Sequence, residues 1–151
     1  MQVAQVRPRL LFGSAPQGEE DIDDLARRGV TGVLCLETDE DIAEYGLHWS
    51  QVSDWYSARG IAAHQVPILD FSPGAIVAHL DTALGAIAAL VEDGRTVYVH
   101  CSEGISRSPT VVIAHLVKAE RLSLAEAVDI VSAARPVVNP YPQALNAIAQ
   151  R

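Results

Sequence analysis

Residues 96–117 read TVYVHCSEGISRSPTVVIAHLV, which places one cysteine and one arginine in a short loop between two apolar runs. The first run, residues 96–99, is typical of a buried strand. The second run follows Pro109, and the first turn of a helix accepts proline without losing a hydrogen bond. This order of strand, loop and helix indicates an α/β fold with the loop at a helix N-terminus.

The loop has the properties of an anion-binding site. A tight turn that leads into a helix leaves its backbone N–H groups unpaired and convergent, and the helix dipole adds positive partial charge. We therefore expect the backbone of Ser102, Glu103, Gly104, Ile105 and Ser106 to bind a phosphoryl group. The side chain of Glu103 should turn to solvent, and Gly104 should supply backbone angles that a side chain would obstruct.

Three side chains of this stretch suit attack on phosphorus. Arg107 carries a planar, charged fork that can bind two phosphate oxygens. The same positive surroundings favour the thiolate form of Cys101, which makes it the predicted nucleophile. Ser108 can donate its hydroxyl to the sulfur when that sulfur becomes a leaving group.

Displacement of an alkoxide or phenolate also needs a proton donor, and Asp70 is the candidate. It lies in the stretch VPILDFSPG, residues 66–74, where an apolar strand ends and Pro73 and Gly74 mark a turn. A carboxyl group on such a loop can act first as general acid and then as general base. Ordinary turn chemistry is the alternative reading, because aspartate is common before turns.

Residues 100–108 resemble the dual-specificity branch of the cysteine-dependent protein tyrosine phosphatase superfamily. The branch pattern His-Cys-x-x-Gly-x-Ser-Arg-Ser is present without a break. The resemblance implies Cys101 as nucleophile, Arg107 and the loop amides as phosphate ligands, and Asp70 as general acid. It also implies that Ser108 assists hydrolysis of a phosphoenzyme and that His100 holds the loop. The expected activity is hydrolysis of phosphotyrosine, phosphoserine and phosphothreonine in proteins.

The resemblance extends over most of the chain, with departures. Residues 10–14 are similar to the opening strand of the family, and residues 135–140 are similar to the segment before its last helix. The family often has Tyr and Met where this chain has His115 and Val117, and residues 141–144 replace its Asn-Gly-Phe signature. The tyrosine-recognition motif of the larger enzymes is absent, which implies a shallower and less selective pocket.

Cys35 has two readings. A lone cysteine in a strand is commonly a small buried hydrophobe. Some members of the superfamily that this chain resembles carry a cysteine at the end of this strand that forms a reversible disulfide with the nucleophile. By that resemblance Cys35 is a possible redox partner of Cys101.

The pattern of the whole chain predicts alternating elements. We expect a mostly parallel central sheet with helices on both faces and the site at the carboxyl ends of its strands. Helices are expected at residues 19–28, 49–59, 75–91, 109–120, from Ser123 onward with Glu126 completing a capping box, and near 143–150; strands are expected at 30–36, 61–68 and 96–99.

Composition predicts one catalytic domain over residues 1–151, because 49% of the 151 residues are hydrophobic. A net charge of −8 argues against nucleic acid as a partner. We expect no membrane association, since no signal peptide is apparent and no uninterrupted apolar stretch approaches about 18 residues. A reactive thiol suits a reducing compartment, and the cytoplasm is expected.

Other activities remain as alternatives. Residues 34–41, with Trp49 and Tyr56, resemble plant glucan phosphatases, although Trp49, Trp55 and Tyr56 at helical spacing are more often core residues. A non-catalytic phosphate-binding module and a rhodanese-like sulfurtransferase are further alternatives. No cofactor is expected. Because His64, His79 and His115 do not have metal-ligand spacing, we also expect metal-independent chemistry.

Overall fold

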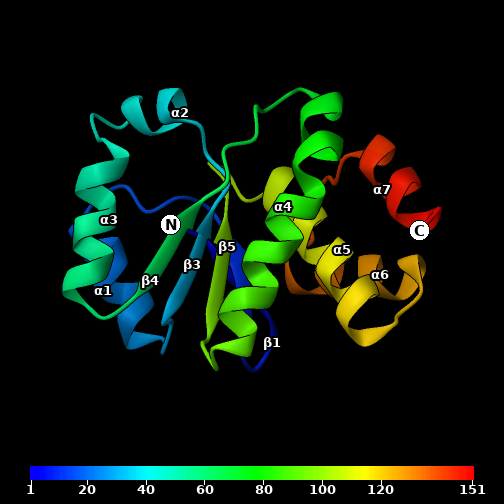
Figure 1. Cartoon of the computed structure of the whole chain (residues 1–151), viewed down its shortest axis with the longest axis horizontal. Coiled ribbons are helices and arrows are strands. Elements are labelled where there is room, and N and C mark those ends of the chain that lie inside the picture. The colour runs from blue at the N-terminus through cyan, green and yellow to red at the C-terminus, as the bar shows by residue number, and fades with distance from the viewer.

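The computed structural model of this chain describes residues 1–151 and contains a five-stranded sheet with the order β1-β2-β5-β3-β4 (Figure 1). The pair β1 and β2 is antiparallel, and the other three pairs are parallel. The expectation of a mostly parallel sheet is therefore confirmed. The strands are β1 (Val3–Arg7), β2 (Leu10–Gly13), β3 (Gly32–Cys35), β4 (Ala62–Gln65) and β5 (Val97–His100).

Seven helices cover the two faces of this sheet. The helices are α1 (Glu19–Arg27), α2 (Asp39–Ala43), α3 (Trp49–Ala58), α4 (Pro73–Glu92), α5 (Arg107–Glu120), α6 (Leu124–Ala134) and α7 (Pro142–Ala149). Figure 1 shows α1 and α3 on one side of the sheet, and α4 to α7 on the other. The expected two-sided arrangement is confirmed.

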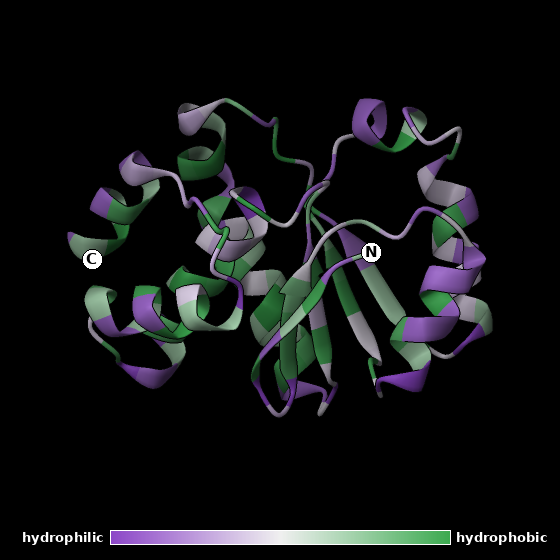
Figure 2. Ribbon diagram, turned by 180° about the vertical axis from the view of Figure 1, so that it is seen from behind, coloured by the Kyte–Doolittle hydropathy of each residue, from purple (hydrophilic) through white to green (hydrophobic).

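Two hydrophobic clusters fill the spaces between sheet and helices. Successive residues of a strand point to opposite faces, so Val97 and Val99 of β5 join the cluster beneath α4 and α5, whereas Tyr98 joins the cluster beneath α1 and α3. Figure 2 shows the strands coloured mainly as hydrophobic, while the surrounding helices alternate between hydrophobic and hydrophilic residues. Continuous apolar strands of this kind are characteristic of a sheet that is covered on both faces.

The 20-residue helix α4 is strongly apolar. By length and mean hydropathy alone it could cross a membrane, although His79, Asp81 and Thr82 interrupt its apolar residues. Its inner face, which includes Ile76, Leu80 and Ile87, is fully buried in the domain core. The outer face is rich in alanine rather than charge, which makes a core helix of this fold resemble a membrane span.

Several boundaries also differ from expectation. The strands β3 and β4 are shorter than predicted, and α5 begins at Arg107, two residues before Pro109. Strand β1 and the short helix α2 were not predicted. The capping box at Ser123 and Glu126 is confirmed by bonds of 3.1 and 3.3 Å in both directions.

The register of the parallel strands assembles one edge of the sheet. Cys35 at the end of β3 lies beside Gln65 of β4 and His100 of β5. Because the three strands run in the same direction, the loops that follow them emerge side by side. These loops carry Glu37, Asp70 and Cys101, so the predicted site residues Asp70 and Cys101 both lie at the carboxyl ends of the strands.

Candidate active site

The loop of residues 101–106, here called the cysteine loop, connects β5 to α5 and turns its carbonyl groups outward. Each of the six carbonyl oxygens has a donor within 3.2 Å. The donors are His100 Nδ1 for Cys101, Ala15 N for Ser102, Arg135 Nη2 for Glu103, Arg135 Nε for Gly104, Asn139 N for Ile105, and Thr110 N and Oγ1 for Ser106.

The backbone N–H groups that follow Cys101, unlike the carbonyl groups, have no hydrogen-bond partner in the protein. Those of residues 102–107 donate to no protein atom. With all carbonyls bonded on the outside, the free N–H groups converge on the inside of the turn, at the N-terminus of the 14-residue helix α5. This arrangement is an anion-binding nest that suits a phosphoryl group.

Gly104 is required by this geometry. Its φ is +71°, and a Cβ at this position would lie 2.5 Å from the carbonyl carbon of Gly13. The loop therefore packs its backbone directly on the end of β2, which only glycine permits.

Cys101 lies at the base of the nest and is 3% exposed. Its Sγ is 3.3 Å from Ser108 Oγ and 3.4 Å from Ser108 N. Ser108 Oγ also lies 3.3 Å from the carbonyl oxygen of Gly13. The hydroxyl of Ser108 can therefore donate either to Gly13 or to a negatively charged sulfur, which suits the role predicted for it.

Arg107 is 1% exposed and is held mainly through one of its terminal nitrogens. Nη1 donates to Asp41 Oδ2 at 2.7 Å and to the carbonyl of Ile68 at 2.9 Å. Nη2 donates to Ser102 Oγ at 3.1 Å, whereas Nε is buried and has no hydrogen-bond partner. Nε and Nη2 form one edge of the guanidinium, so this edge remains available for two oxygens of an anion.

Asp70 is brought to the same edge by the loop that follows β4. Its Oδ2 lies 3.5 Å from Arg107 Nη2. Its Oδ1 accepts hydrogen bonds from Phe71 N at 3.0 Å and from the hydroxyl of Tyr141 at 2.6 Å. The structure thus places the predicted acid beside the predicted phosphate ligand, although 30 residues separate Asp70 from the cysteine loop.

Glu37 is a buried acid that sequence analysis did not single out. Ser102 Oγ donates to its Oε2 at 2.9 Å and in turn accepts from Arg107 Nη2. Burial raises the pKa of Glu37 to about 7, against the lowering effect of the Ser102 bond. The only signal in the sequence was an acid directly after a buried strand.

His100 supports the loop, as the family resemblance implied. It stacks on Tyr98 with ring centroids 5.7 Å apart, and its Nδ1 faces the Cys101 carbonyl. Burial lowers the pKa of His100 to about 4, so the imidazole is neutral near pH 7. The neutral tautomer that donates from Nδ1 satisfies that carbonyl.

Cys35, Glu37 and His100 offer ligand atoms that lie within 4.8 Å of one another, all of them buried. This set includes a thiol, a carboxylate and an imidazole, which are zinc ligands in other proteins. Glu37 and His100 are already engaged with Ser102 and with the Cys101 carbonyl. We therefore assign both to support of the cysteine loop.

The two cysteines lie on opposite faces of the sheet. Cys35 pairs in register with His100 and borders the same small void as Trp49 and Val52 of α3. Cys101 belongs to the cluster beneath α4 and α5. Both thiols are free and buried. The possible pairing of Cys35 with Cys101, implied by the resemblance, stays a prediction.

The aromatic residues considered for glucan binding lie in or against the core. Tyr56 is fully buried, and Trp49 packs against it with ring centroids 6.5 Å apart. Trp55 packs on the same cluster. They do not form an exposed platform for a sugar chain.

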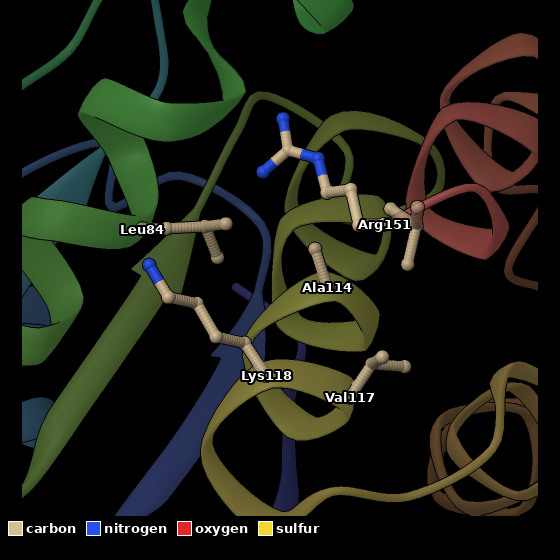
Figure 3. Close-up of a pocket in the computed structure, with 6 residues that line it drawn as sticks. Leu84, Ala114, Val117, Lys118 and Arg151 are labelled. Atoms are coloured by element: carbon tan, nitrogen blue, oxygen red, sulfur yellow. The ribbon is translucent and has the colours of Figure 1, made fainter.

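A cavity of about 340 Å³ lies away from this site, between α4, α5 and the C-terminal segment (Figure 3). Its lining includes Leu84, Ala114, Val117 and Ile148, with Lys118 and Arg151 as the polar members. Val117 is one of the departures from the family pattern. The cavity contains no nucleophile or acid and does not belong to the catalytic arrangement.

Comparisons with known proteins agree with this geometry. A family model described as the catalytic domain of dual specificity phosphatases matches residues 35–150. Human dual specificity phosphatase 28 is 35% identical over 140 residues, which cover 93% of this chain and 72% of that protein. The solved structure of Tk-PTP in its active form superposes with a TM-score of 0.81 at 32% identity, over 99% of this chain and 97% of that one.

A more distant similarity concerns the glucan alternative. The amyloplastic phosphoglucan phosphatase DSP4 of Castanea sativa is 27% identical over 132 residues. That alignment covers 86% of this chain but only 35% of the relative.

Proposed function

Since the chain belongs to the dual specificity phosphatase family, we propose that Cys101, Arg107, Asp70 and Ser108 carry out phosphomonoester hydrolysis through a cysteinyl-phosphate. The chain is a cysteine-dependent dual specificity phosphatase. The observation that carries the assignment of roles is the cysteine loop, where every carbonyl is bonded outside and the N–H groups of residues 102–107 remain free around Cys101 Sγ.

In the first step, Cys101 thiolate attacks phosphorus and the bond to the leaving oxygen breaks. The loop N–H groups and the Nε–Nη2 edge of Arg107 bind the three equatorial oxygens and stabilise the charge in the transition state. Asp70 Oδ2 lies 3.5 Å from that edge and delivers its proton to the departing oxygen.

In the second step, water attacks the cysteinyl-phosphate and sulfur leaves as thiolate. Asp70, now deprotonated, accepts a proton from the water. Ser108 turns its hydroxyl from the Gly13 carbonyl to the sulfur 3.3 Å away, which stabilises the leaving group. The products are inorganic phosphate and free enzyme.

We propose phosphoproteins as the substrates. The apolar side chains of Leu69 and Phe71, which flank Asp70, are 63% and 90% exposed and are available to contact a polypeptide. The glucan alternative has less support, because Tyr56 is buried in this chain and Trp49 and Trp55 are partly buried against the same cluster. A reducing compartment such as the cytoplasm suits a free thiol nucleophile.

The proposal is tested by hydrolysis of p-nitrophenyl phosphate in the presence of reductant and a chelator. We expect turnover by the wild-type chain and none by Cys101→Ser, with Cys35→Ser as the matched control that retains activity. Turnover by Cys101→Ser would refute the assigned nucleophile. Comparison of phosphopeptides with phosphoglucan then tests the substrate class, and faster release from phosphoglucan would overturn the phosphoprotein assignment.

A further inference from the structure

Tyr141 connects the proposed general acid to the helix that follows the cysteine loop. Its hydroxyl donates to Asp70 Oδ1 at 2.6 Å and accepts from Phe71 N at 2.7 Å. Its own backbone N–H donates to Thr110 Oγ1, and that hydroxyl donates to the carbonyl of Ser106. Tyr141 is therefore bonded through its backbone to the end of the cysteine loop by way of Thr110, and through its side chain to the carboxyl group of Asp70.

The two residues that flank Asp70 do little to fix its side chain. Phe71 has a φ of +59°, which is uncommon for a residue other than glycine, and its side chain is 90% exposed. Leu69 on the other side of Asp70 is also exposed. Neither neighbour fixes Asp70 by packing, so its carboxyl group is held by the Tyr141 hydroxyl and Phe71 N on one oxygen and by Arg107 on the other.

Tyr141 itself is well fixed. Its Thr110 partner is fully buried in α5, and Pro142 follows directly as the first residue of α7, which restricts the backbone of Tyr141 to an extended conformation. Burial and the bond to Asp70 raise the pKa of Tyr141 to about 12. The hydroxyl therefore remains a donor over the whole range in which the enzyme is assayed.

The two carboxyl oxygens of Asp70 consequently have different surroundings. Oδ1 already accepts two hydrogen bonds, whereas Oδ2 faces Arg107 Nη2 at the predicted phosphate position. A proton on Oδ1 would face the Tyr141 hydroxyl hydrogen. On the premise that Asp70 is the general acid, we propose that Tyr141 is a positioning residue that holds the carboxyl group so that Oδ2 carries and delivers the proton.

This role predicts a dependence on the leaving group, because a good leaving group needs less protonation. The test compares kcat/KM on p-nitrophenyl phosphate with kcat/KM on phenyl phosphate, whose leaving group is poorer, because kcat/KM reports the step in which the leaving group departs. The ratio of the two rates on one sample does not depend on how much of the enzyme is folded. We expect Tyr141→Phe to slow phenyl phosphate about tenfold more than p-nitrophenyl phosphate, a part of the roughly 10²–10⁴ of a general acid.

Three further variants complete the experiment. Tyr56→Phe removes a buried hydroxyl that makes no hydrogen bond and should keep the wild-type ratio. Asp70→Asn should change the ratio more than Tyr141→Phe, and the double variant should match Asp70→Asn alone. A wild-type ratio in Tyr141→Phe, or an additional loss in the double variant, would overturn the inference about Tyr141. An unchanged ratio in Asp70→Asn would instead refute Asp70 as the acid.

Discussion

Arg107 illustrates how one side chain divides its donors between structure and chemistry. Asp41 and the Ile68 carbonyl bind Nη1, so the guanidinium is fixed before any substrate arrives. Nε has no partner within the protein. Donors that are oriented in advance lose little entropy when they bind a phosphoryl group, which is how a fixed site stabilises a transition state.

This division predicts that Arg107→Lys is not conservative. Lysine has a single ammonium group that cannot bind Asp41 and two phosphate oxygens together. We expect kcat on p-nitrophenyl phosphate to fall by roughly 10²–10³, the usual effect of removing one such donor. The matched control is Arg28→Lys, which changes a surface arginine paired with Asp24 and should leave kcat unchanged. A loss below threefold in Arg107→Lys would contradict the assigned role.

The raised pKa of Glu37 predicts that the free energy of unfolding depends on pH. Its pKa is about 7 in the folded state and 4.5 ordinarily, so between these values the folded state binds the extra proton. Stability from this group is therefore highest below pH 4.5 and decreases as pH rises to 7 and above. His100, whose pKa is lowered to about 4, contributes the opposite slope below its ordinary 6.5. The two slopes partly cancel in the wild-type chain.

Denaturant unfolding of wild type and Glu37→Gln separates the two effects, because His100 is common to both. The free energy of unfolding of wild type minus that of the variant should decrease between pH 5 and pH 8. The expected decrease is on the order of 3 kcal/mol, from about 1.36 kcal/mol per pKa unit. A difference that does not change with pH would show that Glu37 ionises at its ordinary value.

Among the elements, the segment between α6 and α7 connects the cysteine loop to the loop that carries Asp70. Arg135 bonds two carbonyls of the cysteine loop, Asn139 bonds a third, and Tyr141 reaches the Asp70 loop. These bonds hold the carbonyls outward, and the N–H groups face inward as a result. The segment therefore affects phosphate binding although its residues lie outside the nest.

Arg135→Ala tests this effect. The carbonyls of Glu103 and Gly104 lose their donor, and the loop gains freedom to turn them inward, where they repel an anion. A lost bond to a charged group is worth roughly 1.5–3 kcal/mol, so the inhibition constant for inorganic phosphate should rise about tenfold. Arg27→Ala is the control, because Arg27 is exposed on α1. Equal inhibition constants for Arg135→Ala and wild type would show that the loop holds its shape alone.

The parts of the site differ in how far the sequence alone could predict them. The strand, loop and helix at residues 96–117 were predictable, because their chemistry depends on neighbours in the chain. The roles of Glu37, Asp41, Arg135 and Tyr141 depend on contacts between distant segments. Thr38 and Asp41 do form a capping box that local sequence could have indicated, but the bond of Asp41 to Arg107 spans 66 residues. The opposite faces of Cys35 and Cys101 likewise follow from strand register.

At the scale of the whole molecule, a net charge of −8 surrounds a site that must attract a phosphate dianion. The one charged positive group of the site, Arg107, is buried, whereas Glu103 is exposed on the cysteine loop. A substrate therefore meets a negative surface before it reaches the nest. Fields of this kind act on the rate of encounter and weaken as salt is added.

This charge predicts a preference among phosphopeptides that depends on ionic strength. Peptides with basic flanks should have a higher kcat/KM at low salt than peptides with acidic flanks, and the ratio should shrink severalfold in 1 M salt. The screening length falls from about 30 Å at 0.01 M to about 3 Å at 1 M, so only the buried groups then act. Phosphopeptides with uncharged flanks control for general effects of salt. A ratio that does not change with salt would mean that the buried groups alone govern capture of the substrate, and that the acidic surface has no part in selecting it.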